Sequence, residues 1–281
     1  TIIIAAVLPD GLALAGIYTL AQNIASLIQA PQRGVISSSI GPLSQAWKNK
    51  DLARINRIYH SSSINQLIFS VAMFALIWMN FNDAVLNFHL QHRYLEAAMV
   101  FFYIGVMRIV DMGTGVNSQI IVTSTFWRFD FITGIILLAL TLPLNYVFTK
   151  YYFGVTGPAI ANLISLTVYN LIRYWFLYAR FSMQPFSLKT LHTLLLGIGG
   201  YVLSYYVFRD MHGFAGMILR SALFVFVFVS GVKWLELSPD VKPVWQTMLK
   251  KLGIKKGMTG PVKGCYKKGD DRSTLEVGFA S

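Results

Sequence analysis

Four side chains that a lipid bilayer rejects lie near the middle of one long apolar run. The run covers residues 97–127 and holds Arg108, Asp111, Asn117 and Gln119. A charged side chain at the centre of a bilayer costs about 2.5–3.5 kcal/mol on insertion scales, so it persists only where it faces protein or a water-filled cavity. The four residues are therefore candidates for the lining of a polar path through the membrane.

Two of these residues, Arg108 and Asp111, can also neutralise each other. They are three positions apart and so lie on one face of a helix. One interpretation is a charge pair that lines a substrate path, and the other is a static pair that helps the helices to pack. The segment 113–119, GTGVNSQ, combines small residues with amides, a pattern that favours close helix packing or a break in a helix.

A polar stripe is predicted on an earlier apolar run. Tyr18, Gln22, Ser26 and Gln29 follow one another at steps of four, four and three residues and should share one side of a helix. That side is expected to face a partner helix or a cavity. Arg33, near the end of the same run, can hold a phosphate group or extend to lipid headgroups, and the second role is favoured.

The composition places these residues in a membrane protein. The chain is 55% hydrophobic, has a mean hydropathy of +0.54 and has only 13% charged residues, whereas soluble domains carry about 25%. Apolar blocks of about 20 residues match the thickness of the hydrocarbon layer. The predicted fold class is all-α, a polytopic helical membrane protein.

Other functional classes find little support in the sequence. The lysines and arginines behind the net charge of +12 lie in loops and in the C-terminal tail, so no nucleic-acid partner is expected. No Ser/His/Asp set or carboxylate pair appears where it could do chemistry, so neither enzymatic activity nor a cofactor is expected. His89 and His92 have metal-like spacing but lack a third ligand, and the single Cys265 excludes a cysteine cluster.

Seven full spans are predicted after a short apolar stub at residues 1–8. Because no start Met or basic region precedes the stub, it looks like the end of a helix, and the chain is expected to be a fragment. A basic loop is expected at residues 47–60, between the first two spans. The predicted spans are residues 12–31, 62–82, 97–127, 131–149, 155–172, 190–208 and 214–232.

The basic residues fall on alternate sides of these spans, which predicts that the more basic side and the C-terminus are cytoplasmic. The basic side receives the Lys-rich tail together with Lys48, Lys50, Arg54, Arg57, Arg128, Arg173, Arg180 and Lys189. The other side receives Arg93, Lys150, Arg209 and, near its edge, Arg220. In this scheme Arg173 anchors the cytoplasmic end of its span, while Asn162 and Asn170 tie helices together.

Six segments of the sequence follow a familiar order and spacing: GIYTLAQNIASLIQAPQRG, SQAWKNKDL, YHSSSINQLI, RIVDMGTGVNSQII, YFGVTGPAIANLISLTVYNLIRY and MQPFS. They closely resemble the polysaccharide-exporter branch of the multidrug/oligosaccharidyl-lipid/polysaccharide (MATE-like) superfamily, and more narrowly its lipopolysaccharide O-antigen flippases. The resemblance covers about residues 1–256, while the remainder, from residue 257, matches no recognised pattern.

The resemblance implies a fold of two six-helix lobes around a central cleft. The stub would be the end of helix seven and the seven spans helices eight to fourteen. The chain would then be the C-terminal lobe with two extra helices, and the N-terminal lobe would be missing. The implied domains are a transport lobe at residues 1–180, two additional helices at 181–237 and a basic cytoplasmic tail at 238–281, disordered toward its end.

The resemblance also implies a function in the bacterial inner membrane. Its members move an undecaprenyl-diphosphate-linked oligosaccharide from the cytoplasmic to the periplasmic leaflet. The implied partners are this lipid-linked oligosaccharide, membrane lipids and the N-terminal lobe. Cationic side chains in the cleft serve the anionic cargo in this family, and Arg33 and Arg108 are the positions that could do so here.

Two other classes of function stay open. A drug or small-cation antiporter of the same superfamily would favour acidic residues in its cavity. Asp111 is the only acid expected within the membrane, which argues against an antiporter. The second alternative is a non-transporting, half-length membrane scaffold in polysaccharide synthesis.

Overall fold

The computed structural model describes residues 1–89, 91–211 and 213–238, and within these ranges the secondary structure is helical, without a strand. The predicted all-α class is confirmed. Four helical stretches are long and apolar enough to cross a membrane: Gly11–Gln29, Leu52–Asn87, Trp127–Phe181 and Gly213–Trp234. The predicted tail at 238–281 lies outside the described residues apart from Ser238.

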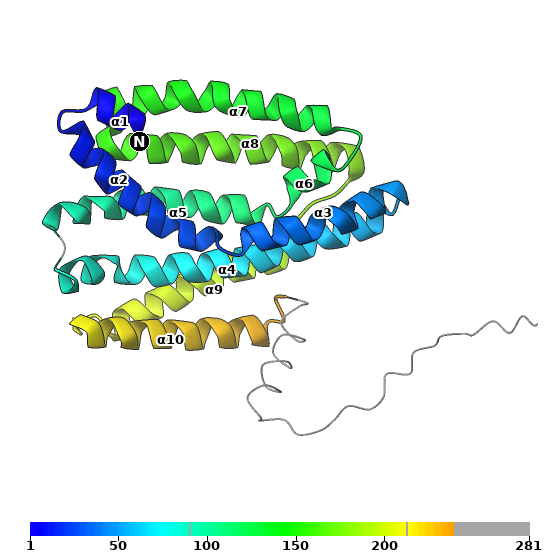
Figure 1. The fold of residues 1–281 in the computed structure, drawn as a ribbon. Helices are drawn as coiled ribbons and strands as arrows, with labels where there is room; N and C mark the ends of the chain where they lie inside the picture. Colours follow the sequence, from blue (N-terminus) through cyan, green and yellow to red (C-terminus); the bar gives the residue numbers. More distant parts are fainter. Residues whose placement is uncertain (90, 212, 239–281) are drawn as a thin grey trace, which may run out of the picture. The chain divides into compact units, whose positions relative to one another are not determined.

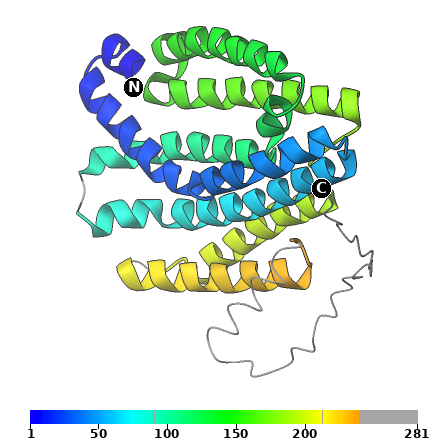
Figure 2. The same cartoon turned by 45° about the vertical axis from the view of Figure 1, so that its right-hand side comes forward.

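Four long helices lie side by side and form the layer that carries the polar residues (Figure 1; Figure 2). α7 (Trp127–Val147) packs on α8 (Gly157–Phe181). α5 (Ala97–Gly113) lies between α8 and α4 (Leu52–Asn87). The candidate span Trp127–Phe181 thus contains α7 and α8, which correspond to two of the predicted spans.

The remaining long helices pack on α4 or on α5. α9 (Leu188–Val207) and α10 (Gly213–Trp234) pack on α4 and on each other. α1 (Ile2–Val7) contacts α2 (Gly11–Ser26), α2 packs on α5, and α3 (Gln32–Lys48) packs on α4. The short helical elements that join these helices are η1 (Leu27–Gln29), η2 (His92–Glu96), α6 (Asn117–Val122), η3 (Phe148–Phe153) and η4 (Gly154–Thr156).

Two apolar clusters hold the helices around the polar residues. The central cluster consists of Ile4, Ala15, Ile17, Tyr18, Ala21, Ala25, Ile28, Phe81, Val85, Ala97, Val100, Phe101, Ile104, Met107, Met112 and Ala159. The end cluster consists of Leu43, Ala46, Ile55, Tyr59, Val116, Ile120, Ile121, Leu177 and Met183. The chain passes from the central to the end cluster between Met112 and Val116, where α5 gives way to α6.

The predicted basic loop at residues 47–60 is wrong, because most of it is helical. Its first residues belong to α3, and from Leu52 onward it belongs to α4, a single helix of 36 residues. Asp51 caps α4, since its carboxylate accepts a hydrogen bond from the Arg54 backbone N–H at 2.9 Å. A helix of this length measures about 54 Å, so its charged first turns can extend past a hydrocarbon core of about 30 Å.

The predicted span at residues 97–127 is not one continuous helix. α5 ends at Gly113, and a turn of residues 114–116 separates it from α6. Gly115 has a φ of +64°, a left-handed backbone that glycine adopts without steric cost. The turn lies against α4, where Ser63 Oγ donates a hydrogen bond to the Gly113 carbonyl at 2.5 Å. Both outcomes that the segment GTGVNSQ allowed are present, since the helix breaks and Gly115 packs closely on Ser62 and Ser63 of α4.

Replacing Gly115 with Ala should lower the free energy of unfolding by about 2 kcal/mol, in the range expected for backbone strain. A Cβ at this position would lie 2.9 Å from Ser62 Oγ and 3.0 Å from Ser63 N. The matched control is Gly134→Ala in α7, where a Cβ meets nothing within 4 Å. The control should be neutral or stabilising by about 0.5–1 kcal/mol. Denaturant unfolding in detergent micelles measures both, and equal effects would contradict the prediction.

Candidate functional site

The break between α5 and α6 brings together polar side chains that are far apart in the sequence. Asn170 of α8 donates through Nδ2 to Asp111 Oδ1 at 3.2 Å, and Asn117 Nδ2 donates to Asn170 Oδ1 at 3.1 Å. Asn170 and Asn117 are only 2% and 3% exposed. The predicted role of Asn170 as a tie between helices is confirmed, since it joins α5, α6 and α8.

The second carboxylate oxygen of Asp111 is bound by a pair of glutamines. Gln32, at the start of α3, donates through Nε2 to Asp111 Oδ2 at 3.0 Å, and Gln29 Nε2 donates to Gln32 Oε1 at 3.0 Å. Asp111 therefore accepts hydrogen bonds from neutral amides of two helices. None of the three ion pairs among the described residues includes it, so no cation in contact balances its charge.

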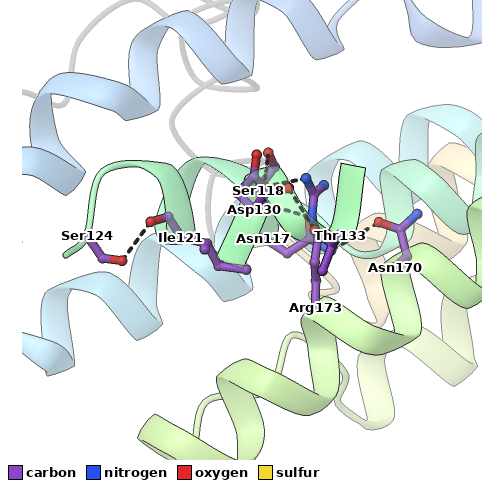
Figure 3. A network of polar contacts seen from close by, with 8 residues as sticks. All are labelled: Asn117, Ser118, Ile121, Ser124, Asp130, Thr133, Asn170 and Arg173. Atoms are coloured by element: carbon purple, nitrogen blue, oxygen red, sulfur yellow. Dashed lines mark hydrogen bonds and ion pairs between the residues drawn. The ribbon is translucent and has the colours of Figure 1, made fainter. Parts of the chain in front are cut away.

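Arg173 and Asp130 form an ion pair beside these amides (Figure 3). Arg173 Nη2 contacts Asp130 Oδ1, and the two side chains are 5% and 21% exposed. Ser118 Oγ donates to the same Asp130 oxygen at 3.3 Å, and the Ser118 backbone N–H donates to Asn117 Oδ1 at 2.6 Å. The polar network is the set of residues joined in this way: Gln29, Gln32, Asp111, Asn117, Ser118, Asp130, Asn170 and Arg173.

Two predictions about charged residues are wrong. Arg173 does not anchor the end of its span, because it is buried and paired with Asp130 in the first turn of α7. The prediction that Asp111 is the only acid within the membrane is also wrong, because Asp130 and Asp83 lie in candidate membrane spans, whereas α5, which holds Asp111, is not one of the four. Each of the two is paired with an arginine, Arg173 and Arg220 respectively. Arg173 and Arg220 therefore point into the helix bundle, where each meets a carboxylate, and not toward the lipid headgroups.

Arg108 is a half-buried cation on α5. Within the described residues it makes no hydrogen bond or ion pair, and its Nε is buried without an acceptor. Asp111 and Tyr18 lie near enough to act on its charge. However, the Arg108–Asp111 pair expected from the sequence is not a contact pair, since Gln32 and Asn170 donate to the two Asp111 oxygens. The role of Arg108 in lining a path stays a prediction.

The predicted polar stripe on α2 and η1 does not lie on a single buried side. Tyr18 is 4% exposed and its hydroxyl accepts a hydrogen bond from Asn162 Nδ2 at 3.3 Å, whereas Gln22 and Ser26 are exposed. Each step of four residues turns the helix by about 40° beyond a full circle. Ser26 has therefore moved well around the helix from Tyr18, and only Gln29 returns to the polar network.

Two further candidates lie outside the polar network: Arg33 is exposed in the first turn of α3, and Gln119 is half-buried in α6. The sequence predicts only three network members as site residues, Gln29, Asp111 and Asn117. Asn170 and Arg173 are assigned other roles there, and Gln32, Ser118 and Asp130 are not singled out. Gln32 is adjacent to Arg33, and Ser118 is adjacent to Asn117. Both could have been found by including the polar residues next to each predicted site residue.

Three hollows in the described part of the chain are separate from the polar network. One of about 520 Å³ lies between α7 and α8, one of about 270 Å³ between α2 and α4, and one of about 220 Å³ among α4, α9 and α10. Neither Arg33 nor Arg108 lines any of them. The Arg108 region is thus closed off from these three hollows in this conformation.

The arrangement can hold and balance charge among apolar helices. Asp111 is bound by amides, Asp130 by an arginine, and Arg108 by no side chain of the described residues. Within those residues, no group of three His, Cys, Asp or Glu side chains is placed to hold a metal ion. Comparisons with protein-family models, with curated proteins and with solved structures find no match to this chain.

Proposed function

We propose that the chain belongs to a membrane flippase of the multidrug/oligosaccharidyl-lipid/polysaccharide superfamily that moves a lipid-linked oligosaccharide from the cytoplasmic to the periplasmic leaflet. The observation that carries the proposal is the half-buried Arg108, which has no partner among the described residues. An unpaired cation in an apolar surrounding is costly, so a ligand that supplies negative charge is favoured there. The diphosphate of a lipid-linked sugar is such a ligand.

The polar network supports the same proposal. Asp111, Asn117, Gln29 and Gln32 offer carboxylate and amide groups within a bundle that is otherwise apolar. Sugar hydroxyls form hydrogen bonds with these groups, whereas lipid chains cannot. The break at residues 114–116 adds backbone polar groups, which membrane proteins keep only where protein or a cavity surrounds them.

In the proposed fold this chain is the C-terminal lobe of a MATE-like bundle, and α9 and α10 are the two additional helices. A second lobe would face the Arg108 side, and rocking of the two lobes would expose the path to one leaflet at a time.

The distribution of exposed arginines and lysines supports the proposed orientation in the inner membrane. Lys48, Lys50, Arg128 and Arg180 are exposed at or near the ends of α3, α7 and α8 that lie together in Figure 1. By the rule that cytoplasmic loops carry the excess of basic residues, this end is cytoplasmic. α10 ends at the same end of the layer in Figure 1, so in this orientation the end of α10 is cytoplasmic as well.

A cation-coupled antiporter is the second candidate, and one observation favours it. Asp111 has no cation in contact, unlike Asp83 and Asp130. A carboxylate in this position can take up and release a proton or a small cation as the helices move. The flippase is preferred because an acid alone does not explain the unpaired Arg108.

Complementation separates the two candidates. The complete protein that contains this chain should restore surface polysaccharide in bacteria that lack their own O-antigen flippase, seen as a ladder of glycan bands on a gel. The same cells should show no additional efflux of cationic dyes driven by a proton or sodium gradient. Efflux without surface glycan would replace the flippase by the antiporter, and the absence of both activities would leave neither proposal standing.

A further inference from the structure

A polar pocket lies at the opposite end of the helix layer from the proposed cytoplasmic side. It measures about 220 Å³ and lies where α4 ends and α9 turns into α10. A single water takes about 30 Å³ in the liquid, so the pocket has room for a polar group of several heavy atoms. Its lining residues are Trp78, Met79, Phe81, Asn82, Asp83, Tyr201, Tyr205, Arg209 and Arg220.

The floor of the pocket is a buried ion pair. Arg220 Nη2 contacts Asp83 Oδ2, the side chains are 5% and 19% exposed, and Arg220 Nε donates to the Gly216 carbonyl at 3.2 Å. The sequence places Arg220 near the edge of the less basic side, and in the structure the residue is buried within the bundle at this end. Its charge is matched by Asp83, and the pair by itself gives the pocket no net charge.

Arg209 gives the pocket its positive charge. It is exposed, and none of the three ion pairs in the described ranges includes it. The lining thus contains two arginines and one aspartate, a net charge of +1. Arg209 can turn its guanidinium toward an anion at the pocket mouth, and the planar guanidinium binds phosphate oxygens in pairs.

The rest of the lining is aromatic and apolar. Tyr201 and Tyr205 stack with ring centroids 5.9 Å apart, and Trp78 and Phe81 form the α4 side. Tyrosine and tryptophan are typical of the level of lipid headgroups, where one part of the side chain is apolar and the other is hydrated. A ligand that combines a phosphate with apolar chains fits this lining better than a soluble anion.

We propose that this pocket binds the phosphate of an anionic phospholipid headgroup, with Arg209 as the cation that contacts it. The inference needs only that the helices span a membrane, and it does not depend on which cargo the protein moves. The lipid would join α4 to the connection between α9 and α10, in addition to the Arg220–Asp83 pair and the Asn87–Met217 hydrogen bond that link α4 to α10 at this end.

Native mass spectrometry of the purified protein in detergent tests the pocket. Phosphatidylglycerol should bind more tightly than phosphatidylcholine with the same acyl chains. Arg209→Gln should weaken phosphatidylglycerol binding roughly tenfold, as expected for the loss of a charged hydrogen bond. Phosphatidylcholine binding should weaken less, because its choline cation already neutralises the phosphate. The matched control is Arg93→Gln, an exposed arginine in η2 whose ion-pair partner, Asp10, is 3.8 Å away. The control should bind as the parent protein does.

Two further measurements check the stability of the variants and distinguish a lipid phosphate from free inorganic phosphate. Both variants should melt at the temperature of the parent protein in lipid-free detergent, because both side chains are exposed. Inorganic phosphate should displace phosphatidylglycerol only at concentrations far above that of the lipid. Displacement at equal concentration would reassign the pocket to a free anion and overturn the lipid proposal. An equal loss in the two variants, or no preference for phosphatidylglycerol, would also overturn it.

Discussion

Replacing Arg173 with Met is expected to lower the free energy of unfolding by about 3–5 kcal/mol, the cost of leaving one partner of a buried ion pair alone. The Arg173 side chain is 5% exposed and contacts Asp130, which is 21% exposed. The substitution also removes a guanidinium that lies 3.7 Å from the centroid of the Tyr169 ring. Heat or denaturant unfolding in detergent micelles measures the loss.

A second substitution identifies the cause of the loss. Arg173→Met combined with Asp130→Leu removes both charges and should recover most of the stability, because apolar residues often replace a buried pair without penalty. Arg128→Met is the matched control, an exposed arginine in the same helix as Asp130, and should change stability by less than about 0.5 kcal/mol. If the double variant is no more stable than Arg173→Met, the unpaired carboxylate is not the cause.

The helices that are mostly apolar could be predicted from the sequence. The predicted spans 131–149, 190–208 and 214–232 agree with α7, α9 and α10 to within four residues at each end. Long apolar runs mark these helices, although α9 is not among the four stretches apolar enough to cross a membrane. Hydropathy predicts the length of such a segment and that it is helical, but it does not predict which other helices it packs against.

The helices that leave the apolar zone could not be predicted in the same way. α3 carries three consecutive serines, from Ser37 to Ser39, and it contains Pro42, yet it is helical because Leu43 and Ala46 pack into the end cluster. Each of the three serines donates a hydrogen bond back to a carbonyl of its own helix. Tertiary packing therefore overrides a local composition that is typical of loops.

The candidate site was predicted as single residues and not as an arrangement. Asp111, Asn117 and Asn170 stood out as polar groups in apolar runs, which sequence can show. Which donor reaches which oxygen of Asp111 depends on the break at residues 114–116 and on the packing of α3 and α8. Helical spacing favoured Arg108 as the partner of Asp111, but two amides hold that carboxylate.

Replacing Arg108 with Gln should reduce polysaccharide export at least about tenfold, because a hydrogen bond to a charged group is worth about 1.5–3 kcal/mol. Arg108 makes no hydrogen bond or ion pair within the described residues, and its Nε is buried without a partner. Removal of its charge should therefore leave the melting temperature unchanged or raise it. Surface glycan in a flippase-deficient strain measures export, and unfolding in detergent measures stability.

The combination of lost export and retained stability is what distinguishes a cargo-binding cation from a packing residue. A packing residue would lose both together. Arg33→Gln should reduce export less than Arg108→Gln, since Arg33 is exposed and solvent ions screen its charge. Arg128→Gln is the control for a change of net charge at an exposed site and should export normally. Normal export by the Arg108→Gln protein would remove Arg108 from the proposed path, whatever its effect on melting.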